Sequence, residues 1–357
     1  MTDRVGSNPL TARINTSMMK RMVPAIVLFT ALAGVQPSSE LPPIGVIEVY
    51  GARRLTEQQV LDALQLKIGD PVSSVRVGRE ARTRVEAIPG VAQVRVNGVC
   101  CDRGKTIIFV GIQEVGQPTA QFRAEPRGSV RLPDDIVKAG AAFDEAVARA
   151  VLSGHAEEDQ SQGHSLVKDP ASRAIQEQFI AFAARDLARL RVVLREANDP
   201  SQRALAAQVI AYAGDKRAVI GDLVDGMRDP SDDVRNNAMR ALALIAMFAL
   251  KNPAPGLVVP ATPFIDLLNS IEWTDRNKAS LALESLTETR DPALISELRS
   301  RALPSLIEMA RWKSEGHAES AFLVLGRVAG LPDDAITAAF ARGDRDSVIE
   351  AALKLAK

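Results

Sequence analysis

Apolar and polar residues alternate in short runs before residue 115 and follow a helical period after residue 132. The alternating runs predict β-strands, because successive side chains of a strand point to opposite faces of a sheet. Two amphipathic segments lie between the first and second of these runs. The pattern predicts the order strand, helix, helix, strand, strand, with strands at 44–50, 91–96 and 106–112 and helices at 56–64 and 74–88.

Two local signals support this order. Thr56 and Gln59 have the spacing of a capping box at the start of a helix. In this arrangement the side chain of each residue accepts a hydrogen bond from the backbone N–H of the other. The four residues from Asp102 to Lys105 separate the last two predicted strands and include a glycine, so we expect a hairpin turn there.

Several short motifs in this part of the chain occur in a recognisable order. They are Ile47-x-Val49-x-Gly51, Leu66-x-x-Gly69-Asp70, Pro89-Gly90-Val91-x-x-Val94-x-Val96 and the strand end Gln113-Glu114. With these motifs, 44–115 resembles the polypeptide-transport-associated (POTRA) domain of bacterial outer-membrane assembly and secretion proteins. The resemblance implies a periplasmic module that binds other chains by adding a strand to its sheet edge. Such domains usually precede a β-barrel or a division-protein core, and no barrel pattern follows here; a generic α/β domain is the alternative.

The remainder of the chain is predicted to be helical and contains an internal repeat. Amphipathic helices are expected at 134–152 and 171–197, and four aligned segments follow. Their shared alanines are Ala206, Ala238, Ala279 and Ala321, at spacings of 32, 41 and 42 residues. This register predicts that the alanines lie where paired helices pack closely and that Asn237 faces solvent.

The repeated pattern Asp-Pro…Val-Arg-x-x-Ala-x-x-Ala-Leu, clearest at 229–244, resembles HEAT repeats. The resemblance implies an α-solenoid that presents an extended surface to a protein partner, and it implies no chemistry. The predicted fold class is therefore α+β, a small POTRA-like β-α-α-β-β domain followed by an all-α HEAT-like solenoid. The predicted parts are a signal segment (1–33), a linker (34–43), the POTRA-like domain (44–115), a second linker (116–131), a helical lead-in (132–198) and HEAT-like repeats (199–357).

The N-terminus has the organisation of an export signal. Residues 18–34 comprise a short basic stretch, an apolar run and the small residues Ala31 and Ala33, which are typical of a signal-peptidase site. We expect cleavage after Ala33 and a periplasmic or cell-envelope location. An uncleaved segment would instead attach the protein to a membrane, and a buried N-terminal helix is the remaining alternative.

Composition and motifs exclude several functional classes. Lys plus Arg and Asp plus Glu each total 44, so the chain lacks the positive charge of a non-specific nucleic-acid binder. No nucleotide-binding, zinc-protease or Cys-x-x-Cys motif occurs. Cys100 and Cys101 are adjacent on a predicted strand, so their side chains are expected on opposite faces. An incidental metal contact near His155 and His164 is conceivable, but no catalytic residue, cofactor or metal site is assigned.

Two polar and aromatic stretches precede helices of the repeat. Both should lie on one edge of the array, and Trp and Arg are enriched in protein interfaces. The predicted partner-binding residues are Trp273, Arg276, Asn277, Lys278, Arg311, Trp312, Lys313 and His317. The alternative is that each tryptophan fills the joint between neighbouring repeats.

The sequence thus predicts a non-enzymatic cell-envelope scaffold or adaptor that binds proteins through the solenoid surface and the POTRA-like sheet edge. The alternative function is a lyase-like enzyme or an enzyme accessory subunit, by analogy with HEAT-like lyase subunits that act on protein-bound chromophores. That alternative would require convergent acid, base or thiol groups, which no local motif supplies.

Overall fold

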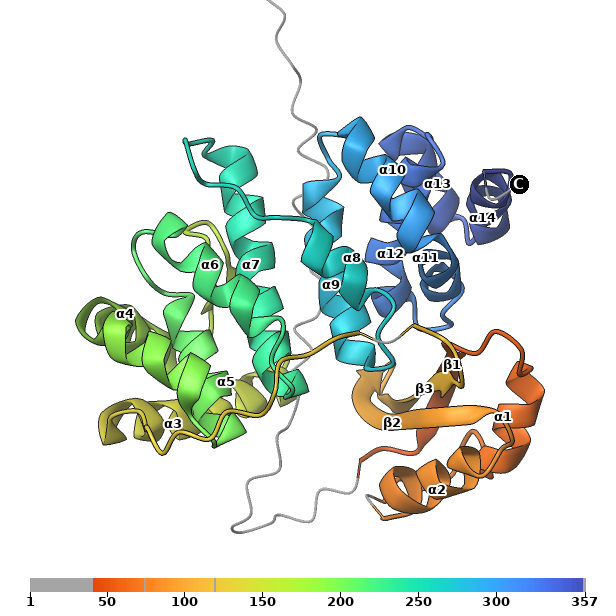
Figure 1. Ribbon diagram of the computed structural model, residues 1–357, viewed down its shortest axis with the longest axis horizontal. Coiled ribbons are helices and arrows are strands. Elements are labelled where there is room, and N and C mark those ends of the chain that lie inside the picture. The colour runs from red at the N-terminus through yellow and green to blue at the C-terminus, as the bar shows by residue number, and fades with distance from the viewer. Residues whose placement is uncertain (1–40, 74, 119, 356–357) are drawn as a thin grey trace, which may run out of the picture.

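A small three-stranded sheet packs against one side of a larger group of helices in the computed structural model (Figure 1). The structure describes residues 41–73, 75–118 and 120–355. The predicted α+β class is confirmed, with the strands of the sheet in the first third of the chain and helices in the rest. The predicted signal segment, with Ala31 and Ala33, lies outside the described residues.

The α/β part has the predicted order of elements. They are β1 (Ile44–Tyr50), α1 (Glu57–Leu64), the π-helical turn η2 (Val75–Glu80), α2 (Ala81–Glu86), β2 (Val91–Asp102) and β3 (Lys105–Glu114). The sheet order is β1-β3-β2, with β1 parallel and β2 antiparallel to β3. The capping box is confirmed, because the hydroxyl of Thr56 accepts from the backbone N–H of Gln59 at 3.2 Å and the Gln59 side chain accepts from the Thr56 N–H at 2.9 Å.

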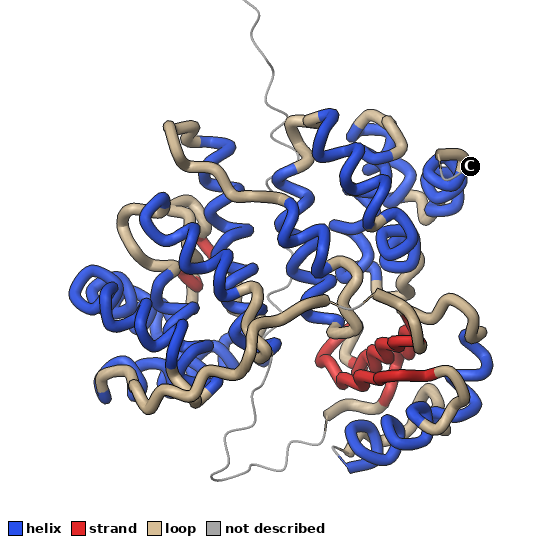
Figure 2. The backbone as a smooth tube through the Cα atoms, viewed as in Figure 1, coloured by secondary structure: helices blue, strands red, loops and turns tan. Residues whose placement is uncertain are grey.

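The central strand β3 is covered on both faces. Ile108, Val110 and Ile112 point toward α1 and α2 and form a small core with them. Ile107 and Phe109, with the alternate orientation, belong to the same hydrophobic core as the helices of the second half. The face of the sheet that a free α/β domain would expose to water is therefore buried against the helices, as Figure 2 shows for the strands in red.

The second part of the chain is an array of helices. They are α3 (Asp134–Leu152), α4 (Pro170–Glu196), α5 (Pro200–Ile210), α6 (Arg217–Gly226), α7 (Asp232–Lys251), α8 (Thr262–Leu267), α9 (Trp273–Leu286), α10 (Pro292–Arg301), α11 (Leu303–Ala310), α12 (Glu315–Val328), α13 (Asp333–Ala341) and α14 (Arg345–Leu353). The polar loop between α3 and α4 contains a short hairpin of two antiparallel strands with two residues each, β4 (Glu158–Asp159) and β5 (Leu166–Val167).

Six of these helices pack in succession, in the order α4, α5, α7, α9, α12 and α14. The helices between them in sequence form a second layer, in which α6 contacts α7, α8 contacts α9, and α10 and α11 contact α12. The aligned alanines Ala206, Ala238, Ala279 and Ala321 lie on α5, α7, α9 and α12 and are all 0% exposed. Their predicted packing positions are confirmed, whereas Asn237 does not face open solvent but is half-buried and donates to the carbonyl of Ala204 at 3.0 Å.

Three arginines at one repeat position are buried along an edge of the array. Arg203, Arg235 and Arg276 precede the aligned alanines by three residues, and none is more than 1% exposed. Each donates to the backbone carbonyl six residues earlier, at 2.8, 2.9 and 2.6 Å respectively. This shared geometry follows from the repeat, because equivalent helices begin after equivalent turns.

Each of these arginines also forms an ion pair with a carboxylate further along the chain. Arg203 bonds both oxygens of Asp229, at 2.9 and 2.8 Å, and Arg235 bonds both oxygens of Asp275, with closest approaches of 2.9 Å. Arg276 bonds Glu308 at 2.9 Å. Two-point contacts of this kind fix the relative orientation of the two units as well as their distance.

Residues 120–131, part of the predicted linker 116–131, run along the same edge as a strap (gold in Figure 1). The guanidinium of Arg123 bonds Asp229 and the carbonyl of Leu194. The ring of Phe122 lies 4.0 Å from the guanidinium carbon of Arg235. The strap thus covers the arginines of α5 and α7 on its way to α3.

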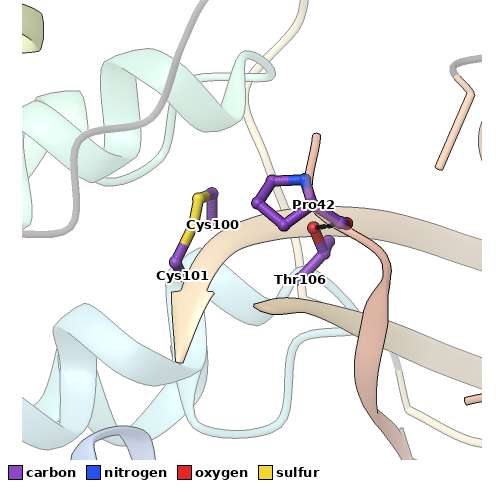
Figure 3. The surroundings of a disulfide bond; sticks show 4 residues. All are labelled: Pro42, Cys100, Cys101 and Thr106. Atoms are coloured by element: carbon purple, nitrogen blue, oxygen red, sulfur yellow. Dashed lines mark hydrogen bonds between the residues drawn. A yellow bond between two sulfur atoms is a disulfide. The ribbon is translucent and has the colours of Figure 1, made fainter. Parts of the chain in front are cut away.

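Cys100 and Cys101 form a disulfide between adjacent residues near the tip of the β2–β3 hairpin (Figure 3). The expectation that the two side chains point to opposite faces is wrong, because the pairing of β2 with β3 is irregular between Val99 and Asp102. Opposite them, the hydroxyl of Thr106 donates to the carbonyl of Pro42 at 2.6 Å.

A glycine on β3 provides a test of the packing between sheet and helices. A Cβ atom at Gly111 would lie 1.9 Å from the carbonyl oxygen of Ile271, so Gly111→Ala is expected to lower the free energy of unfolding by about 1–3 kcal/mol. At Gly98 on β2 the nearest heavy atoms would be 3.7 Å away, so Gly98→Ala should be tolerated. Urea unfolding of both variants measures the difference, and equal stabilities would show that the sheet does not pack here.

Candidate functional site

The two sequence stretches predicted to bind a partner come together around one ring of the sheet. Phe109 of β3 stacks on Trp273 with ring centroids 5.0 Å apart and meets the edge of Trp312 at 5.2 Å. His317 contacts the same ring at 5.3 Å. The two stretches do lie on one edge of the array, and the surface they form is covered by the chain's own sheet.

Polar contacts surround this aromatic cluster. The hydroxyl of Tyr50 donates to the carbonyl of Ile271 at 2.7 Å, although 221 residues separate them. Its ring also lies 4.6 Å from the guanidinium carbon of Arg276, so the third buried arginine is covered by β1. Arg95 and Asn97 of β2 both bond Glu272, the residue that precedes α9.

A buried carboxyl group completes the contact. One oxygen of Glu48 accepts from the backbone N–H groups of Lys313 and Ser314, the latter at 3.0 Å. Burial raises the pKa of Glu48 to about 7, against the opposing effect of these two hydrogen bonds. The carboxyl therefore takes up a proton in the folded protein near neutral pH.

The eight predicted partner-binding residues do not share one environment. Trp273, Arg276, Trp312 and His317 are buried beneath the sheet, and Lys313 is an exposed residue at its rim, where its ammonium reaches the carbonyl of Ile47 at 3.3 Å. Asn277 is half-buried and Arg311 is exposed. Lys278 is buried elsewhere, in a pocket on the array. The two tryptophans therefore do not form an open surface. They pack against the chain's own sheet, and filling a joint between repeats is not their whole role.

The pocket that contains Lys278 has a volume of about 470 Å³ and is called here the inner pocket. It is formed by one face each of α3, α5 and α7, which supply residues at spacings of three and four along each helix. Its apolar wall includes Phe143 and Val147 from α3, Leu205 from α5 and Leu244 from α7. A volume of this size lies in the range of pockets that bind small molecules.

Amide and hydroxyl groups lie among these apolar walls. Asn236 accepts from the hydroxyl of Thr274 at 2.7 Å and Asn237 donates to a backbone carbonyl, so both amides are held in place. Gln176 donates to the hydroxyl of Tyr212 at 2.9 Å, and that hydroxyl donates to the carbonyl of Ser165 at 2.9 Å. Asn236 also donates to the side-chain carbonyl of Asn237 at 3.2 Å, so these hydrogen bonds hold the polar groups of the lining in fixed positions.

Charged groups gather where α7 and α9 meet. The guanidinium of Arg240 bonds Glu158 of β4, and both line the inner pocket together with Lys278. Burial, and then the positive charge of Arg240, lower the pKa of Lys278 to about 7. Burial opposes the ionisation of Glu158, but Arg240 and Gln160 outweigh it and hold its pKa below the usual value. On the other side of the pocket, burial raises the pKa of Asp233 to about 6.

The aligned repeat contained a signal for this pocket. Of the four residues that directly precede the shared alanines, Leu205, Asn237 and Lys278 line the pocket, and Ser320 does not. The contribution of α3, and of Glu158 from the loop, has no comparable signal in the sequence.

Within the described ranges, no group of three His, Cys, Asp or Glu side chains could hold a metal ion. His155 is exposed, whereas His164 is buried beside Lys216, whose ammonium lies 2.9 Å from its Nδ1 atom. No helix of residues 41–73, 75–118 or 120–355 has the length and apolar character needed to cross a membrane.

No protein-family model matches the chain, and a search of curated proteins finds no significant relative.

Glu48 makes the contact between sheet and array dependent on pH. The carboxyl group of Glu48 loses its proton near pH 4.5 in the unfolded chain but keeps it to about pH 7 in the folded protein. The contribution of the protonated Glu48 to the free energy of unfolding is therefore full below pH 4.5 and is lost as the pH rises toward 7. Glu48→Gln keeps the accepting oxygen and cannot ionise. Relative to this variant, the native protein should lose about 1–3 kcal/mol of unfolding free energy between pH 4.5 and 8. Urea titrations across this range measure it, and parallel pH profiles would contradict the assignment.

Proposed function

We propose that the protein is a non-enzymatic scaffold or adaptor that binds a segment of a partner polypeptide in the inner pocket. The observation that carries this proposal is the pocket itself, in which one face each of α3, α5 and α7 combines apolar walls with fixed amide groups. We further propose that the helical array is an α-solenoid of the HEAT type. The succession of packed helices, the four buried alanines and the three equivalent arginines support it.

The POTRA-like sheet edge remains a second proposed surface. Among the described strands β2 pairs only with β3, so its outer edge has backbone groups available for an added strand. A pocket of about 300 Å³ lies beside this edge, lined by η2 and β2 and by the side chains of Arg79, Arg82 and Arg95. The face of the sheet does not take part, because the helices cover it.

An enzyme or enzyme accessory subunit is the alternative function. One observation favours it, since Lys278, Arg240, Glu158 and Asp233 bring cationic and acidic groups into one pocket. Convergent groups with shifted pKa values are typical of active sites. A binding protein returns its ligand unchanged in mass, whereas an enzyme converts it, so mass spectrometry of bound material after incubation distinguishes the two.

Partner binding in the inner pocket is tested by filling it. Ala141 and Ala142 are neighbouring exposed residues of α3, but only Ala141 lines the pocket. With a photo-crosslinking amino acid at Gln208 in the pocket, we expect discrete crosslinked partners that disappear in Ala141→Trp and persist in Ala142→Trp. Crosslinks that survive in Ala141→Trp would contradict binding at this site.

We also propose export to the periplasm or cell envelope, from the basic, apolar and small residues of 18–34. N-terminal sequencing of protein recovered from the periplasm should begin at Gly34. Recovery of an intact chain from the cytosol would contradict export.

A further inference from the structure

Lys278 is a buried cation without a partner in the part of the chain that the structure describes. Its side chain lines the inner pocket, and the residue is only 6% exposed. None of the described residues forms a hydrogen bond or an ion pair with its ammonium group. A buried charge without a partner is unfavourable, so the group is expected either to lose its proton or to bind an anion.

The neighbouring charges do not supply that anion. Glu158 attracts Lys278, but it is bonded to Arg240, whose own positive charge repels Lys278. His317, from α12, is neutral near pH 7 because burial, and then Lys278, lowers its pKa to about 4. This end of the inner pocket therefore has one positive charge more than its described carboxylates balance when Lys278 is protonated.

The rest of the lining limits what can carry the missing negative charge. Asp144, Asp199 and Asp233 also line the inner pocket and disfavour a ligand with several acidic groups. Phe143, Leu205 and their neighbours favour an apolar body. A single carboxylate at the end of an apolar peptide satisfies both conditions, and the same lining contains the polar amides of Asn236 and Asn237.

We infer that Lys278 binds the C-terminal carboxylate of a polypeptide segment that ends in apolar residues and occupies the inner pocket. This rests on the proposed function and specifies its ligand. The cost of burying the ammonium is then offset by a charge-assisted hydrogen bond to the ligand. A passing Asp or Glu side chain, which presents the same group, is a distinct outcome of the test.

The full chain is incubated with pools of N-acetylated tetrapeptides built from Ala, Val, Leu and Phe. One pool has free C-terminal carboxylates, a second has C-terminal carboxamides, and a third has carboxamides with one internal Glu. Peptides retained by ultrafiltration are identified by mass spectrometry, and their affinities are measured by calorimetry. The free acids are expected to bind at least about tenfold more tightly than either amidated pool, which corresponds to about 1.4 kcal/mol.

Lys278→Met removes the charge at similar length and should abolish the preference for the free acid. Replacing a buried charge by an apolar side chain is commonly tolerated, and circular dichroism with a thermal melt checks that the variant is folded. Lys278→Gln provides a second, polar variant. Lys216→Met is the matched control, because Lys216 is also buried but does not line the inner pocket.

The outcomes separate this inference from the proposed function. Equal binding of acids and amides, sensitive to Ala141→Trp, would overturn the role of Lys278 and leave peptide binding in place. Preference for the internal Glu pool would overturn the assignment to a chain terminus. A free-acid preference that persists in both Lys278 variants, or no retention of any pool, would also overturn the inference.

Discussion

Three guanidinium groups, those of Arg203, Arg235 and Arg276, are buried at equivalent places of α5, α7 and α9, and the arrangement of the whole chain depends on satisfying them. Each needs partners in several directions, because a buried charge that loses a partner is strongly destabilising. Backbone carbonyls of the preceding turn and carboxylates of the following unit meet part of this need. The remaining side of each is covered by the first third of the chain, through Glu125, Phe122 and Tyr50 in turn. One repeated side chain thus joins successive helices to each other and the array to the strap and sheet.

Helix α9 shows how closely these roles are combined. Trp273 stacks on the sheet, Asp275 and Arg276 take part in successive ion pairs, and Lys278 lines the inner pocket, all within two turns. Because a helix directs consecutive side chains to different sides, a single segment can serve the core, the edge and the pocket at once. This also explains why the segment has no clear amphipathic pattern, since polar side chains are buried around most of its circumference.

Local features of the fold could be predicted from the sequence, and long-range ones could not. The capping box at Thr56, the order of strands and helices along the chain, the helix at 134–152 and the buried register of Ala206 to Ala321 depend on interactions within a few residues or on the repeat. The residues around Trp273 and Trp312 were predicted to bind a partner or to fill a joint between repeats, and the structure instead packs both rings against Phe109 of the chain's own sheet. The segment that covers these residues could not be predicted, because a periodic pattern shows which side chains are buried but not which distant segment buries them. The inner pocket was missed for the same reason, since its walls come from separate helices and its charged end needs Glu158 from a loop.

The order of the contacts between the N-terminal part of the chain and the helices has a consequence for folding. Tyr50 contacts α9 and Glu48 contacts the turn before α12, whereas the strap, later in sequence, contacts the earlier helices α5 and α7. The first third of the chain therefore runs along the array in the reverse direction to the order in which its helices are synthesised. The apolar face of the sheet is synthesised before the helices that cover it, and its cover is complete only after His317 has been added. Contacts between such distant segments slow folding, so this face must remain in solution through most of synthesis, which is the stage at which a chaperone has most to protect.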